Sequence, residues 1–303
     1  MPTCRLYRPS MRADYASRSL TECWDRVGLD MRELKIIAVI LMFVAAATDS
    51  WAASVDGITL NWNSAGSGAQ AVIFVHGWTC DDTSWQGQVQ AISQKYRVIT
   101  LDLPGHGKSG SPKDGRFSMN LFARAVEAVR SEAKVEKAVL VGHSMGTPVI
   151  REYALMYPQR VAGLVLVDGL IQIPGMARPA MLPMTGVAGL AAREMLVRSF
   201  FGPKTSPELQ QKILKMTMGT KEATADGAMT ATWDPSTWKD DAISVPVLGV
   251  YADKSTVANP AGMKRLYPNL EYHEIPETGH FLMMERPEEF NRLLVAFLAK
   301  LKY

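Results

Sequence analysis

One serine stands in a pentapeptide that suits nucleophilic catalysis. Ser144 is the centre of residues 142–146 (Gly-His-Ser-Met-Gly), which follow the apolar run 138–141 and precede apolar residues at helical spacing. A tight turn from a strand into a helix lifts a serine hydroxyl above the sheet edge, over the N–H groups of that helix. Such a turn requires nearly side-chain-free residues two positions before and after the serine, and both are glycine. We therefore predict that Ser144 is a nucleophile, although a Gly-Ser loop that merely links two elements fits the pentapeptide alone.

The elements around this turn predict an α/β fold. The runs that suit buried strands are 71–75, 97–101, 138–141, 161–167, 246–251 and 270–275. Amphipathic segments separate these runs; Ser118 suits the cap of one helix, and a last helix is expected from about Phe281 to Lys300. A hairpin strand is expected at 58–62. The alternation predicts a mainly parallel central sheet with helices on both faces.

Several polar residues stand where these strands end. His76, Ser144, Asp168 and Asp253 each follow the last residues of an apolar run. In open α/β sheets, ligands bind at the carboxyl ends of the strands. These positions are therefore expected to lie near one site.

Residues 170–244 interrupt the alternation. The segment has no convincing strand, shows helical patches near 187–200 and 207–218, and is too long for a plain loop. We predict a mostly helical cap over Ser144, inserted between the core segments 53–169 and 245–303. Its methionines are Met176, Met181, Met184, Met195, Met216, Met218 and Met229. Because methionine adapts to varied apolar partners, we expect a small-molecule substrate with an apolar portion.

Composition disfavours several other classes of function. The 303 residues are 47% hydrophobic and 21% charged, as in an ordinary globular protein. A net charge of +3 is too small to indicate nucleic acid or a membrane surface as a partner. Histidines and acids lack paired metal-ligand spacing, and no glycine-rich phosphate loop follows the first strand. We therefore expect neither a metal nor another cofactor.

Residues 31–52 have the pattern of a signal peptide. A basic segment at 31–35 precedes the apolar run 36–47, and Ser50 and Ala52 suit the −3 and −1 positions of a cleavage site. As a helix the run would rise only about 18 Å, short of a roughly 30 Å hydrocarbon layer, so no membrane span is expected after cleavage. We expect residues 1–30 to be an upstream extension from a start placed too early. The mature protein would be secreted or periplasmic, with Cys80 as its single cysteine and no internal disulfide.

Four motifs together resemble a known superfamily. They are 76–78 (His-Gly-Trp), 102–109 (Asp-Leu-Pro-Gly-His-Gly-Lys-Ser), 142–146 and 279–281 (Gly-His-Phe). With these motifs in this order, the chain resembles members of the α/β-hydrolase fold superfamily over roughly residues 55–303. The resemblance implies catalytic residues in the chain order serine, acid, histidine, and it says little about the substrate.

The resemblance points to His280 as the catalytic base. A serine hydroxyl is a weak nucleophile and needs a base within hydrogen-bond reach. Of the five histidines, His280 is the late one that begins a loop, after a glycine and before an apolar helix. His76 and His106 fall where the family uses histidine to shape the backbone, and His143 is expected to pack behind the turn.

Two aspartates are candidates for the acid. Many relatives place the acid three residues beyond the end of the late strand, and by that count the position is Ser255. Asp253 comes two residues earlier, and a shorter loop could still bring its carboxylate to His280. Asp168 ends the preceding core strand, where some relatives keep their acid and many keep a structural aspartate. Either residue would orient His280 and stabilise its imidazolium form.

The family pattern also implies an oxyanion hole built from backbone N–H groups. Its donors would be Met145, directly after the nucleophile, and Trp78, after His76 and Gly77. The resulting expectation is a serine hydrolase that cleaves a carboxylic ester or related acyl compound. A C–C bond hydrolase, lactonase, amidase or perhydrolase stays open, as do a lipase activated at interfaces and a ligand-binding or sensory protein with slow or no turnover.

Overall fold

The structure, a computed structural model, describes residues 53–172 and 185–303. The predicted upstream extension (1–30), the signal peptide (31–52) and part of the predicted cap (173–184) lie outside the described residues. Within the described ranges, no helix is both long enough and apolar enough to cross a membrane.

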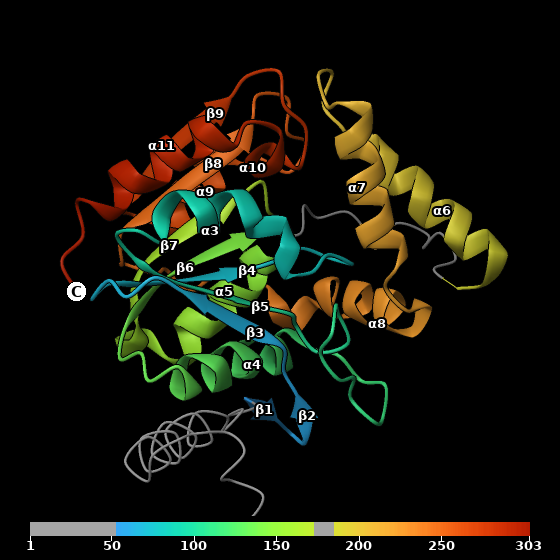
Figure 1. Cartoon of the computed structure of the whole chain (residues 1–303), viewed down its shortest axis with the longest axis horizontal. Coiled ribbons are helices and arrows are strands. Elements are labelled where there is room, and N and C mark those ends of the chain that lie inside the picture. Colours follow the sequence, from blue (N-terminus) through green and yellow to red (C-terminus); the bar gives the residue numbers. More distant parts are fainter. Residues whose placement is uncertain (1–52, 173–184) are drawn as a thin grey trace, which may run out of the picture. The chain divides into compact units, whose positions relative to one another are not determined.

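The core is a seven-stranded sheet in the order β3-β5-β4-β6-β7-β8-β9 (Figure 1). Its strands are β3 (Trp62–Ala65), β4 (Ala71–Val75), β5 (Arg97–Leu101), β6 (Ala138–His143), β7 (Val161–Val167), β8 (Val247–Ala252) and β9 (Leu270–Ile275). The strands from β5 to β9 pair in parallel, and β3 pairs antiparallel with β5. Every residue of β4, β6, β7 and β8 is buried, which explains their continuous apolar sequences. The predicted mainly parallel sheet is confirmed.

The predicted strand at 58–62 is wrong in its bounds. β1 (Ser54–Val55) and β2 (Ile58–Thr59) form a separate small hairpin, and the edge strand β3 begins only at Trp62. Asp56 and Gly57 make the hairpin turn, both with positive φ. The residues between β2 and β3 carry the chain from the hairpin to the edge of the sheet.

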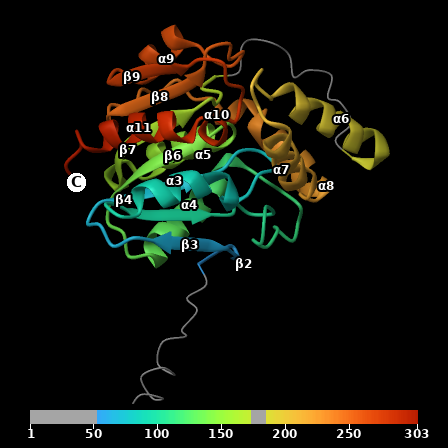
Figure 2. The same cartoon turned by 45° about the horizontal axis from the view of Figure 1, so that its top comes forward.

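Helices cover both faces of the sheet (Figures 1 and 2). One face packs against α4 (Met119–Glu132), α5 (Gly146–Met156) and α9 (Pro260–Leu266). The other face packs against α3 (Gln86–Ile92), α10 (Leu282–Glu285) and α11 (Pro287–Leu298). Short 3₁₀ turns lie at Asp82–Trp85, Pro158–Arg160 and Pro235–Thr237. Ser118 caps α4 as predicted, because its hydroxyl accepts from the N–H of Leu121.

The last helix is not continuous from Phe281 to Lys300 as the sequence predicts. It divides into α10 and α11, with Arg286 in a non-helical conformation between them. Pro287 is the first residue of α11, where its missing N–H costs no hydrogen bond and its ring favours the start of a new helix. The break leaves α10 as a short helix directly after His280 and Phe281.

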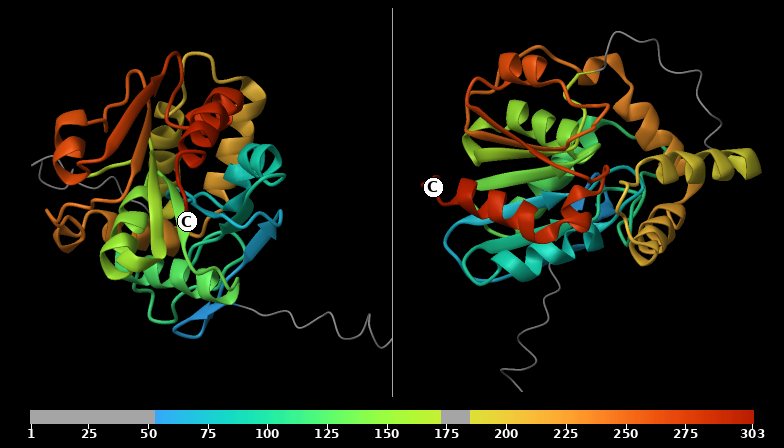
Figure 3. Two further views of the ribbon diagram at one scale, coloured as in Figure 1. Left: turned by 90° about the vertical axis from the view of Figure 1, so that its left-hand side faces the viewer. Right: turned by 90° about the horizontal axis from the view of Figure 1, so that it is seen from above.

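In the described part of the predicted cap, three helices lie between β7 and β8. They are α6 (Gly186–Ser199), α7 (Pro207–Met218) and α8 (Glu222–Thr232), and they lie together at one end of the sheet (Figure 3). The sequence predicts α6 and α7 but not α8. Arg193 of α6 is buried and donates to the carbonyls of Met218 and Thr220 at 3.2 and 2.9 Å. It thereby satisfies carbonyls at the end of α7 and ties two cap helices together.

Candidate active site

Ser144 lies on a strained turn between β6 and α5. Its φ of +51° falls in a region that side chains rarely adopt. A Cβ atom on Gly142 would lie 2.4 Å from the carbonyl oxygen of Gly146, and one on Gly146 would lie 2.4 Å from that of Val75. Because both obstacles are backbone atoms, no side-chain movement could relieve them. Glycine is therefore required at both positions, and the turn holds Ser144 in place.

The structure joins His280 to Asp168. Their Nδ1 and Oδ2 atoms are 2.6 Å apart, although the residues are 112 positions apart in sequence. The side chains are only 12% and 4% exposed, so water scarcely competes for the hydrogen bond. Because an ionised carboxylate only accepts, His280 donates from Nδ1 and keeps a lone pair on Nε2. A neutral His280 in this tautomer can accept a proton from a nearby hydroxyl.

Further donors surround the Asp168 carboxylate. The N–H of Ala252 donates to Oδ1 at 3.1 Å. Burial by itself would raise the pKa of Asp168, but the hydrogen bond and charge of His280, together with Ser255 and Ala252, outweigh it and lower that pKa. Ser255 stands at the position where the resemblance places an acid. Here its hydroxyl instead supports a carboxylate that comes from the end of β7.

Asp253 occupies a different environment. Its side chain is exposed, and its backbone N–H donates to the carbonyl of Ile275 at 3.4 Å. It lines the same cavity as Ser144 and His280, but Nδ1 of His280 is already bonded to Asp168. Of the two predicted acids, the geometry therefore favours Asp168.

Ser144 and His280 face a common cavity of about 740 Å³. Trp78 and Met145, the two predicted oxyanion donors, line it as well. Met145 directly precedes α5, so its N–H has no acceptor within the helix. The indole N–H of Trp78 donates to the carbonyl of Ala225 in α8 at 2.7 Å, so a cap helix contacts the predicted oxyanion segment.

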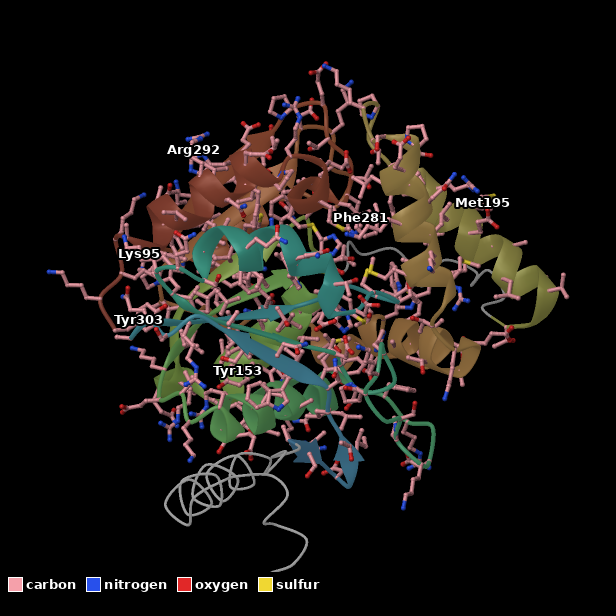
Figure 4. All side chains as sticks on the ribbon, viewed as in Figure 1. Lys95, Tyr153, Met195, Phe281, Arg292 and Tyr303 are labelled. Carbon is pink, nitrogen blue, oxygen red and sulfur yellow. The ribbon has the colours of Figure 1, made fainter. Side chains whose placement is uncertain are left out.

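The cavity is mainly apolar on its cap side. The apolar residues there are Leu170, Leu196, Val197, Phe200, Phe201, Met229 and Trp233. Of the cap methionines in the described residues, Met229 alone lines the cavity. Met195 is 61% exposed and lies on the outer side of α6 (Figure 4). The sulfur of Met216 instead accepts from the hydroxyl of Ser84 at 3.4 Å.

His143 has a more specific position than the sequence indicates. Its ring is buried, and Nε2 donates to the backbone carbonyl of His280 at 2.8 Å. Burial first, and then the charge of nearby His280, lower the pKa of His143 to about 3, so the ring stays neutral. His143 thus links the nucleophile turn to the His280 loop. The sequence places His143 beside Ser144, but it does not indicate which group the ring contacts.

Two other histidines shape the backbone. The Nε2 atom of His76 accepts from the N–H of Leu103 at 3.0 Å, and Nδ1 donates to the carbonyl of Gly77 at 2.8 Å. His106 is buried against His76, and burial is the main cause that lowers its pKa to about 3. Both rings are fully buried, which agrees with the structural role expected for them.

Two other kinds of chemistry, a cysteine nucleophile and a metal ion, were considered for the site. Cys80 lines the cavity but is buried, and that burial raises the pKa of its thiol to about 12. The thiol is therefore protonated at neutral pH and a poor nucleophile. Within residues 53–172 and 185–303, no three His, Cys, Asp or Glu side chains gather in a way that could hold a metal ion.

Comparison with known families agrees with this geometry. Residues 70–287 match the model of the alpha/beta hydrolase fold. The chain belongs to this family. The match spans β4 to the start of α11, and so includes Ser144, Asp168 and His280.

This α/β-hydrolase is similar to proteins with different reactions. It shares 32% sequence identity with the dihydrolipoyllysine-residue acetyltransferase component of an acetoin cleaving system from Pseudomonas putida. The alignment covers 82% of this chain and 69% of that protein. It shares 29% sequence identity with a 2-hydroxy-6-oxononadienedioate/2-hydroxy-6-oxononatrienedioate hydrolase from Burkholderia vietnamiensis. The alignment covers 80% of this chain and 92% of that hydrolase. A malate-bound thermophilic esterase from Thermogutta terrifontis superposes with a TM-score of 0.73 and 26% identity, over 82% of this chain and 96% of the esterase.

Proposed function

We propose that this α/β-hydrolase cleaves a carboxylic ester or a related acyl compound through an acyl-enzyme at Ser144. One observation carries the proposal: a serine on a strained turn shares an apolar cavity with a histidine that is bonded to a buried aspartate. The intact set of groups disfavours a ligand-binding protein without turnover. The cavity lining supports a substrate with an apolar portion.

In the proposed reaction, Oγ of Ser144 attacks the substrate carbonyl while Nε2 of His280 takes the hydroxyl proton. The N–H groups of Trp78 and Met145 stabilise the negative oxygen of the tetrahedral intermediate. The C–O bond then breaks, and His280 gives the proton to the departing alkoxide. Water, deprotonated by His280, releases the acid and restores Ser144. Asp168 keeps the ring oriented and stabilises the imidazolium form.

A C–C bond hydrolase is the second candidate. The relative from Burkholderia vietnamiensis supports it, because its name states hydrolysis of a dioate rather than an ester. We place the ester first because the similar esterase covers the chain equally well and the cap side of the cavity is apolar. The same Ser144, His280 and Asp168 would serve either reaction.

A fluorophosphonate probe tests the proposed nucleophile. We expect one adduct per folded chain, located at Ser144 by peptide mass spectrometry, and hydrolysis of p-nitrophenyl esters in a panel of increasing acyl length. The panel should include a vinylogous dienoate as substrate for the C–C reaction. A folded chain that neither reacts with the probe nor hydrolyses any ester would refute the proposal.

We also propose that the protein is exported, on the strength of the pattern at residues 31–52. Expression of the full chain in a bacterium should give an exported form whose first residue lies at or near Ala53. Amino-terminal sequencing of the periplasmic and medium fractions measures this. An active protein that stays in the cytoplasm with residues 31–52 intact would contradict it.

A further inference from the structure

The loop that contains His280 is held by the cap as well as by the core. The backbone N–H of His280 donates to the carbonyl of Phe200, just after α6, at 2.8 Å. The two rings also contact each other, with centroids 4.6 Å apart. On the other side, the carbonyl of His280 accepts from His143 of the core. Both backbone polar groups of the proposed base are therefore fixed, one by each part of the protein.

Two glycines bring the cap and the His280 loop into backbone contact. A Cβ atom on Gly202 would lie 2.3 Å from the backbone nitrogen of Gly279, and one on Gly279 would lie 2.3 Å from that of Gly202. Neither position can therefore hold a larger residue without separating the two segments. The contact is close enough that a shift of one segment must move the other.

A carboxylate bridges the same two segments. The oxygens of Glu285, at the end of α10, accept from the N–H of Gly279 at 3.0 and 3.2 Å. A Cβ atom on Gly202 would lie 2.6 Å from Oε2 of Glu285, so the carboxylate lies directly against this segment of the cap. The hydroxyl of Thr205 accepts from the N–H of Gly202 at 2.8 Å and also helps to lower the pKa of Glu285. Glu285 and Thr205 thus meet at the junction between the His280 loop and the cap.

Glu285 does not act on substrate directly, because it is absent from the described residues that line the cavity. Burial raises the pKa of Glu285, and nearby Gly279, Thr205 and Phe281 oppose this rise. A half-buried carboxylate is costly unless donors surround it. Here a donor comes from Gly279 of the His280 loop and the carboxylate lies against Gly202 of the cap, so the interaction serves the junction between them.

We propose that Glu285, together with Thr205, is a positioning residue that locks the His280 loop to the cap. The cap and the base then move as one body, and His280 reaches its working position only when the cap is seated. The inference rests on the proposed function, because it takes His280 as the base.

The test compares Glu285→Gln, Thr205→Val, the double variant and wild type, with kcat and KM per active site titrated by the fluorophosphonate. We expect kcat to fall ~10- to 100-fold in each single variant, as for a small misplacement of a catalytic group, with KM within about threefold. Because both residues act at one junction, the double variant should lose less than the product of the single losses.

Glu127→Gln is the matched control. Glu127 is also a partly buried carboxylate with hydrogen bonds, to Arg130 and Tyr153, but it lies on α4 away from the cavity. It should keep wild-type kcat. A wild-type kcat in Glu285→Gln, a change in KM alone, or an equal loss in Glu127→Gln would each overturn the inference. Activity that survives in Ser144→Ala would instead overturn the proposed function.

Discussion

Replacement of Ser144 by alanine should reduce kcat for ester hydrolysis by at least ~10⁴-fold, because it removes the hydroxyl that forms the acyl-enzyme. Cys80 also lines the cavity, but its raised pKa keeps the thiol protonated. The variant should also lose the fluorophosphonate adduct. Rates from a stopped assay at high enzyme concentration, with mass spectrometry of the labelled protein, measure both losses.

Ser131→Ala is the control for this variant, since Ser131 is an exposed serine of α4. It should keep full activity. Ser144→Gly adds a test of the strained turn: because glycine tolerates a φ of +51°, it should be more stable than Ser144→Ala by about 1 kcal/mol in urea unfolding. Ester hydrolysis by folded Ser144→Ala at more than a tenth of the wild-type rate would refute the mechanism.

Asp168→Asn should lower kcat by roughly 10³- to 10⁴-fold, whereas Asp253→Asn should stay within about threefold of wild type. An asparagine amide can donate to Nδ1 of His280, which moves the ring proton to Nε2. His280 then cannot accept the proton of Ser144. Asp253 is exposed and does not bond to His280, so loss of its charge should matter little. Steady-state kinetics on the best ester of the panel compare the two variants.

The same pair also differs in the pH dependence of stability. The folded-state pKa of Asp168 is lowered, so its contribution to stability is present above the pKa of the unfolded chain and is lost as pH falls through the folded value. Asp168→Asn should therefore be less stable than wild type at neutral pH, with a difference that shrinks in acid.

The kinetic comparison of the two variants has one contrary outcome. If Asp253→Asn alone lost activity, Asp253 would be the acid that orients His280.

Local sequence patterns determined most of the core and the nucleophile turn. Continuous apolar runs predicted the strands from β4 onward, because strands buried on both faces need no polar positions. The two glycines around Ser144 identified the turn, because the backbone there is so crowded that neither position can hold a side chain. The helix α8 was missed, since its alanine- and threonine-rich sequence has little amphipathic contrast. The break before Pro287 could have been predicted from the proline alone.

The tertiary structure decided which groups meet. Asp168 and Asp253 both follow strands, and no local pattern tells which of the two carboxylates reaches His280. The choice depends on the path of the loop after β8, which brings Ser255 to Asp168 and leaves Asp253 exposed. The contacts of His143 and Glu285 with the His280 loop likewise could not be predicted from local sequence. Periodicity records which face of an element is buried, whereas a hydrogen bond between distant side chains depends on how the packed elements place them.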